Sequence, residues 1–187
     1  MARKSLNEML ADLLTSFPDN NTKFITPAIM RTYFDNLIKA IRPSYAILRR
    51  DTGVTQAVTT SDTPLVFTTS DVTASLGEYT ANAAIGEIAR VDGGGTSNFT
   101  FTADISSPSN SNRLLTFTLY KNGVAIPFRQ SQSFNVANET LSLSFTALHF
   151  NATAATYSMR VQSSVNETFT FSNMVLVAQT IPVNSYT

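Results

Sequence analysis

Residues 115–124 read Leu-Thr-Phe-Thr-Leu-Tyr-Lys-Asn-Gly-Val, and this stretch decides the fold class. Apolar and polar side chains alternate as far as Tyr120, which is the period of a strand with one buried and one solvated face. Asn122-Gly123 is a pair favoured in the two-residue turn of a β-hairpin, because both turn residues need a positive φ. The stretch therefore predicts a strand, a tight turn and the start of an antiparallel partner strand.

The same alternation recurs along most of the chain after residue 54, with Ser and Thr at most of the outward positions. It is found at residues 98–105, 141–145, 157–161 and 169–171, and residues 85–91 form a further expected strand. Residues 174–178, Met-Val-Leu-Val-Ala, are apolar throughout and predict a strand that is buried on both faces. About nine or ten such strands predict a mainly β fold, an antiparallel two-sheet sandwich of the jelly-roll kind.

The first fifty residues have a different character. Residues 1–50 carry eight basic and four acidic residues, whereas residues 51–187 carry five basic and nine acidic ones. The hydrophobic period changes at the same place, from that of a helix to that of a strand. We therefore expect two parts, a helical segment at 1–50 and a β-sandwich at 51–187.

Two short α-helices are expected before the sandwich. The first covers residues 6–17, where Ser5 and Glu8 can form a capping box. The second begins at Thr26-Pro27, a good N-cap followed by proline at the first helical position, and it ends at Arg42-Pro43.

Helices of this length cannot bury their apolar stripes by pairing with each other alone. They pack on the sandwich of the same chain, or they dock on another protein or on copies of the chain. We expect docking, through the apolar residues Leu6, Leu10, Leu13, Phe17, Ile25, Ile29, Tyr33, Phe34, Leu37 and Ile38.

Composition excludes several classes of function. The chain has no cysteine and one histidine, so disulfides, thiolate zinc sites, cysteine nucleophiles and multi-histidine metal sites are not expected. Its 13 basic and 13 acidic residues leave no net charge to attract nucleic acid. No apolar run is long enough to span a bilayer, so no membrane partner is expected either.

Little in the chain suggests catalysis. His149 has no Ser or Asp motif of the hydrolase type nearby, and a surface or half-buried structural role is expected for it. Residues 92–95, Asp-Gly-Gly-Gly, lack the Lys-Ser/Thr of a phosphate-binding loop and are expected to form a hairpin loop. We predict a protein that is not an enzyme, with no catalytic residue, no cofactor and no metal.

Charged residues make up 14% of the chain, and the mean hydropathy is +0.01. A monomer of this composition would expose apolar surface that soluble monomers usually bury. Association with copies of itself, closed by cyclic symmetry, removes such surface from water.

Two stretches resemble known proteins. Residues 10–38, which contain the Asp-Asn turn at 19–20 and the Ile-Thr-Pro sequence at 25–27, resemble the N-terminal segment of tailed-phage fibre and decoration proteins. Residues 99–177, with Leu-Tyr-Lys-Asn-Gly-Val at 119–124, resemble the trimeric tumour-necrosis-factor-like jelly rolls of such phage proteins.

The resemblance implies a non-enzymatic structural protein on the exterior of a virion. It implies a homotrimer whose N-terminal helices attach to the major capsid protein or another virion protein. The absence of a repetitive shaft favours a compact capsid decoration or cement protein (a head fibre). The alternative is a short tail fibre or spike that binds a receptor on the host surface.

Overall fold

The structure is a computed structural model that describes residues 29–34, 44–67, 72–91, 95–107 and 112–181. Outside one short helix at residues 29–34, its regular structure is all β. The strands are β1 (Tyr45–Arg50), β2 (Val54–Val58), β3 (Thr63–Pro64), β4 (Val72–Leu76), β5 (Tyr79–Asn82), β6 (Glu87–Arg90), β7 (Gly95–Ser106), β8 (Arg113–Lys121), β9 (Val124–Phe134), β10 (Thr140–Asn151), β11 (Ala155–Ser163) and β12 (Glu167–Ile181).

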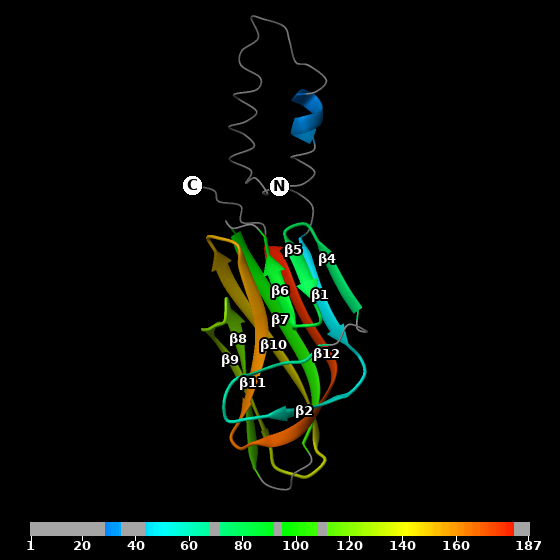
Figure 1. Ribbon diagram of the computed structural model, residues 1–187, viewed down its shortest axis with the longest axis vertical. Helices are drawn as coiled ribbons and strands as arrows, with labels where there is room; N and C mark the ends of the chain where they lie inside the picture. Colours follow the sequence, from blue (N-terminus) through cyan, green and yellow to red (C-terminus); the bar gives the residue numbers. More distant parts are fainter. Residues whose placement is uncertain (1–28, 35–43, 68–71, 92–94, 108–111, 182–187) are drawn as a thin grey trace, which may run out of the picture.

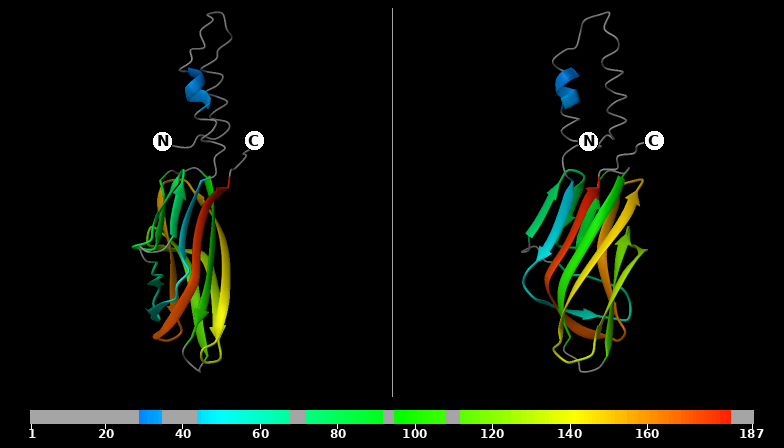
Figure 2. Two further views of the ribbon diagram at one scale, coloured as in Figure 1. Left: turned by 90° about the vertical axis from the view of Figure 1, so that its right-hand side faces the viewer. Right: turned by 180° about the vertical axis from the view of Figure 1, so that it is seen from behind.

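The strands form two six-stranded antiparallel sheets that lie face to face (Figures 1 and 2). The first sheet has the order β10-β7-β12-β1-β4, and β2 pairs with β12. The second has the order β5-β6-β11-β8-β9, and β3 pairs with β11.

The pairing of eight of the strands is nested. Strand β1 pairs with β12, β6 with β11, β7 with β10, and β8 with β9. Among these eight strands the first therefore pairs with the last, and each further pair lies inside the previous one along the chain. This is the connectivity of a jelly roll, as the sequence predicts.

The core lies between the two sheets and is rich in aromatic rings. Phe101 on β7 and Phe117 on β8 come from different sheets, and their ring centroids are 5.7 Å apart. Phe99 and Tyr157 meet in the same way at 4.4 Å. The alternation that predicts β7 places Phe99, Phe101 and Ile105 in this core, because side chains two residues apart share a face.

The predicted hairpin is confirmed. Asn122 and Gly123 have φ values of 49° and 76°, and they join β8 to β9 with Lys121 paired to Val124. The side chain of Asn122 also accepts a hydrogen bond of 2.8 Å from the backbone N–H of Thr156. The turn is thereby held to the neighbouring strand β11.

Several expectations need correction. The sandwich begins at Tyr45, because residues 45–50 form strand β1 and were expected in the helical segment. The described residues contain twelve strands, where about nine or ten were expected. The strand expected at 85–91 is shorter, Glu87–Arg90, because Gly86 has a φ of 65° and belongs to the preceding turn.

The described residues contain one short helix, at 29–34, where two were expected. It lies within the second expected helix, and the first, at residues 6–17, lies outside the described residues. None of the helical residues described here forms a segment long and apolar enough to cross a membrane.

Candidate interaction surfaces

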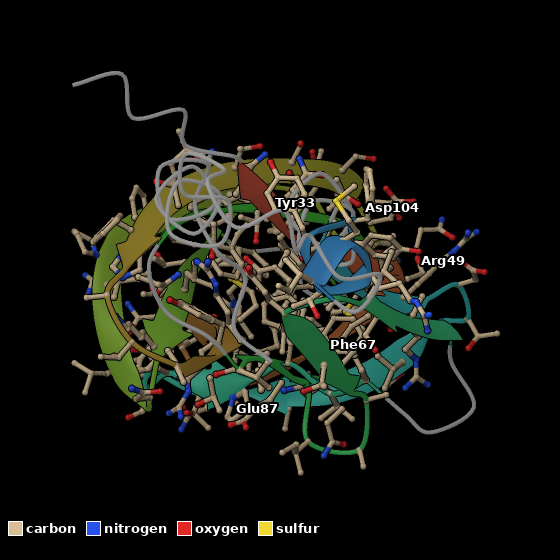
Figure 3. The ribbon with its side chains drawn as sticks, turned by 90° about the horizontal axis from the view of Figure 1, so that it is seen from above. Tyr33, Arg49, Phe67, Glu87 and Asp104 are labelled. Carbon is tan, nitrogen blue, oxygen red and sulfur yellow. The ribbon has the colours of Figure 1, made fainter. Side chains whose placement is uncertain are left out.

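Three of the ten predicted docking residues lie in the part of the chain that the structure describes. They are Ile29, Tyr33 and Phe34, and the other seven lie outside it. Phe34 is 50% exposed, and its ring meets that of Tyr33 edge-on at 6.1 Å. The helix lies beyond the end of the sandwich at which β1 begins (Figure 1; Tyr33 is labelled in Figure 3). The exposed ring therefore remains available for contact with another surface.

Among the described residues, the outer face of the first sheet carries no charged side chain in the half that lies nearer the start of β1. We call this surface the uncharged face. Strand register aligns its members in rows, such as Ile47 beside Val177, Val177 beside Thr100, and Thr100 beside Thr146. Its outward residues are Tyr45, Ile47, Asn98, Thr100, Thr146, Leu148, Phe150, Val175, Val177 and Gln179.

Large apolar side chains are exposed at the β10 edge of this face. Leu148 is 52% exposed and Phe150 is 62% exposed. The adjoining charges lie at the boundary and are already partnered. Arg49 Nε lies 2.7 Å from Asp51 Oδ1, and Asp104 accepts hydrogen bonds from Asn173 and Ser142, which lower its pKa.

Strand β12 explains why this face is unusual. Residues 174–178 predict a strand that is buried on both faces, and the structure buries Met174, Leu176 and Ala178 in the core. Val175 and Val177 point instead to the uncharged face and remain partly exposed. Within the described ranges, one apolar side of this strand therefore packs in the core and the other apolar side stays partly exposed.

A second feature, the polar network, lies at the end of the sandwich where β1 begins. Arg90 on β6 is 2% exposed, and its Nη2 lies 2.9 Å from Glu78 Oε2. Its Nη1 donates hydrogen bonds to Gly95 O at 2.8 Å and to Ser97 Oγ at 3.2 Å. A Cβ at Gly95 would lie 2.9 Å from Nη2, so the guanidinium needs a residue without a side chain there.

Further hydrogen bonds extend the polar network across both sheets. The hydroxyl groups of Tyr79 and Ser97 are 2.6 Å apart, and Asn151 Nδ2 donates to Ser97 Oγ at 2.8 Å. Tyr157 OH donates to Asn151 Oδ1. Burial raises the pKa of the Tyr157 hydroxyl, which keeps it protonated as a donor.

The polar network also reaches Ser44, which directly precedes β1, and Thr180 near the end of β12. Glu78 N–H donates to Ser44 Oγ at 3.3 Å, and Thr180 Oγ1 donates to Glu78 Oε2 at 3.2 Å. Thr180 N–H donates to Ser44 O at 2.9 Å. The point at which the chain enters the sandwich is therefore held by buried polar contacts.

Sequence reasoning missed the polar network. Arg90 and Glu78 have no spacing that distinguishes them from surface charges, which are by far the commoner case. The one signal available is the run of glycines that ends at Gly95, and it was interpreted as a flexible loop. Gly93 and Gly94 of that run lie outside the described residues.

His149 is half-buried, as expected for a structural histidine. Its Nε2 lies 3.4 Å from Lys121 Nζ, and its ring packs edge-on against Tyr157 at 6.1 Å. Burial and the Lys121 charge lower its pKa from the ordinary value of 6.5. Among the residues that the structure describes, no group of three or more His, Asp and Glu side chains could hold a metal ion.

Comparison with known proteins gives no family assignment. No family model matches the chain, and no curated protein matches it. Among solved structures, the globular domain of zebrafish complement 1qA has a TM-score of 0.48 and 15% identity, covering 76% of this chain and 100% of its own. Eiger TNF from S. frugiperda has a TM-score of 0.49 and 13% identity, covering 78% of this chain and 98% of its own. At these scores and identities the assignment of the fold rests on the strand pairing described above.

Proposed function

We propose that this protein is a homotrimeric, non-enzymatic structural protein of a phage virion, a capsid decoration or cement protein attached through its N-terminal helical segment. The observation that carries the proposal is the uncharged face, a surface of β12 and its neighbours that stays partly exposed among the residues the structure describes. In this proposal the other two copies cover it.

Self-association of the uncharged face is favoured by its chemistry. Burial of apolar surface contributes about 25 cal/mol per Å2, and Val175, Val177, Leu148 and Phe150 all lie on this face. In the half of this face nearer the start of β1, the described residues carry no charge. Burial of that half between copies therefore has no large electrostatic cost. Closed cyclic symmetry allows each copy to use the same surface. The choice of a trimer comes from the resemblance of residues 99–177 to trimeric jelly rolls.

Attachment to a particle is assigned to residues 1–44. Residues 10–38 resemble the attachment segment of phage fibre and decoration proteins, and the half-exposed Phe34 supports contact with a partner surface. The partner in this proposal is the major capsid protein or another virion protein, on the outside of the particle. Three attached copies would combine weak contacts into durable binding.

The first test is the substitution Val177→Asp in the full chain. It places a charge in the middle of the uncharged face, so we expect the trimer to dissociate to monomers in multi-angle light scattering. Val124→Asp is the matched control, because Val124 is 68% exposed at the β8–β9 hairpin, away from this face. A folded Val177→Asp variant that remains a trimer would contradict the proposed interface.

The second test is a cryo-EM reconstruction of the purified particle that contains this protein. Trimeric knobs over the icosahedral shell are expected. Density confined to the tail vertex would instead favour the alternative, a short tail fibre or spike that binds a host receptor.

A further inference from the structure

The outer face of the second sheet carries a cluster of charged and polar side chains. Arg160 on β11 pairs in register with Thr118 on β8, and Thr118 pairs with Arg129 on β9. These three side chains therefore lie in one row on one face. This face is opposite the uncharged face: Glu87 on the second sheet and Asp104 on the first lie toward opposite sides of the sandwich (Figure 3). Thr118 is buried within this row and Arg129 is exposed, so the Arg129 end of the row stays accessible if the uncharged face is covered.

Tyr120 joins this row to a carboxylate. The guanidinium carbon of Arg160 lies 4.3 Å from the centroid of the Tyr120 ring, and Tyr120 OH donates a hydrogen bond to Asp62 Oδ2. Burial, and then the hydrogen bond to Asp62, raise the pKa of the Tyr120 hydroxyl, so it keeps the proton that it donates.

Hydrogen-bonding capacity in this cluster is incompletely used. Asp62 Oδ1 and Arg160 Nε are both buried, and neither has a hydrogen-bond partner. Asp62 accepts from the tyrosine instead of pairing with Arg160. Buried polar atoms in folded proteins nearly always have a hydrogen-bond partner. The unpartnered acceptor of Asp62 and the unpartnered donor of Arg160 therefore need an explanation.

A depression of about 510 Å3 adjoins the cluster and is lined by Ala125, Ile126, Pro127 and Arg129. It lies where the β8–β9 register shifts between Thr118 and Tyr120, a β-bulge of the kind found next to binding sites. The Arg129 side chain is exposed, and in the described part of the chain it has no carboxylate partner.

We propose that this surface binds an acidic saccharide, with the sugar carboxylate between Arg129 and Arg160 and a sugar hydroxyl donating to Asp62. Guanidinium groups are the preferred partners of carboxylates, because their donors match the two oxygens. The Asp62 carboxylate offers an acceptor to a sugar hydroxyl, and this contact favours an acidic sugar over a simple anion bound by the arginines alone. The wall at Ala125–Pro127 suits the apolar face of a sugar ring. This site does not depend on the proposed function, because it lies on the second sheet, on the side of the sandwich opposite the uncharged face.

The test is calorimetric titration of the full-length protein with three acidic saccharides: trigalacturonic acid, glucuronic acid and N-acetylneuraminic acid. Maltotriose and inorganic phosphate are the uncharged and simple-anion comparisons. We expect at least one acidic saccharide to bind, and Arg129→Gln to weaken its binding about tenfold or more, as for loss of a hydrogen bond to a charged group. Asp62→Asn should also weaken it.

Arg49→Gln is the matched control, because Arg49 is an exposed arginine at the boundary of the opposite face. It should leave saccharide binding unchanged. The proposal is overturned if none of the three acidic saccharides binds, if maltotriose or phosphate binds as tightly, or if Arg49→Gln weakens binding as much as Arg129→Gln. Light scattering on the same samples reports the oligomer separately, so loss of the trimer and loss of saccharide binding can be told apart.

Discussion

Arg90 and Glu78 carry opposite charges into the interior, where the two side chains are only 1% and 6% exposed. A buried ion pair contributes little compared with well-packed apolar residues, but removal of one partner leaves a charge without compensation. Arg90 Nη1 also donates to Gly95 O and Ser97 Oγ, whereas its buried Nε has no hydrogen-bond partner. The pair therefore makes the end of the sandwich sensitive to single substitutions.

The substitution Glu78→Gln keeps the side-chain shape and removes the charge that Arg90 faces. We expect the free energy of unfolding to fall by about 3–5 kcal/mol, measured by urea denaturation. Asp51→Asn, which breaks the exposed pair with Arg49, is the control and should cost at most about 1 kcal/mol. Equal effects of the two substitutions would show that burial of the Arg90 pair is unimportant.

His149 should make the stability of the protein depend on pH. Its pKa in the folded chain lies below the ordinary value of 6.5, so below that pH the unfolded chain takes up the proton first. Stability is therefore expected to fall as the pH drops below about 6.5. His149→Gln should reduce this loss when melting temperatures are compared at pH 7.5 and 5.5. An unchanged difference would assign the pH dependence to other groups.

At the level of elements, the sequence predicts most of the sandwich. The alternating stretches at 98–105, 115–120 and 141–145 lie in β7, β8 and β10, because period-two patterning depends on one solvated face. Strand β1 escaped prediction because its six residues contain only a short alternation, and Arg49 and Arg50 add to the basic excess that distinguishes residues 1–50. In the sheet, Ala46 and Leu48 face the core. The Arg49 side chain is exposed on the outer side of β1, at the boundary of the uncharged face.

The β8–β9 turn should tolerate a side chain at residue 123 poorly. A Cβ there would meet no atom within 4 Å, so the cost comes from the φ of 76° alone. Gly123→Ala should lower the free energy of unfolding by about 1–2 kcal/mol in chemical denaturation. Gly53→Ala is the control, because its Cβ would make an ordinary 3.5 Å contact with Thr170 and its φ is not in the left-handed region. A loss at Gly53 as large as at Gly123 would contradict this conformational explanation.

For the whole molecule, the sequence predicts a jelly roll and the exposure of apolar surface by a monomer. It does not predict on which face of the sandwich that apolar surface lies. The location of the uncharged face depends on register between strands far apart in sequence, such as Ile47 with Val177 and Phe150 with Thr96. The saccharide site depends likewise on the row from Arg160 to Arg129. The alternation of residues within one strand does not indicate which residues of other strands lie beside it.

Removal of residues 1–42 should separate assembly from attachment. The sandwich keeps its core, its polar network and its uncharged face, so we expect the shortened protein to remain a trimer in light scattering. Incorporation into particles should be lost, as measured by quantitative mass spectrometry of purified virions. Retained incorporation would contradict attachment through the N-terminal segment, and a monomer would place trimerisation within the deleted residues.

The position of β1 between two neighbouring strands also determines how the protein would bear mechanical load. The strand follows directly from the N-terminal segment and is hydrogen-bonded along both edges, to β12 and to β4. A pull on the N-terminal side acts along β1, whereas these hydrogen bonds run across it. They would be loaded together in shear rather than broken one after another, so a sandwich tethered by this end should resist detachment by unfolding.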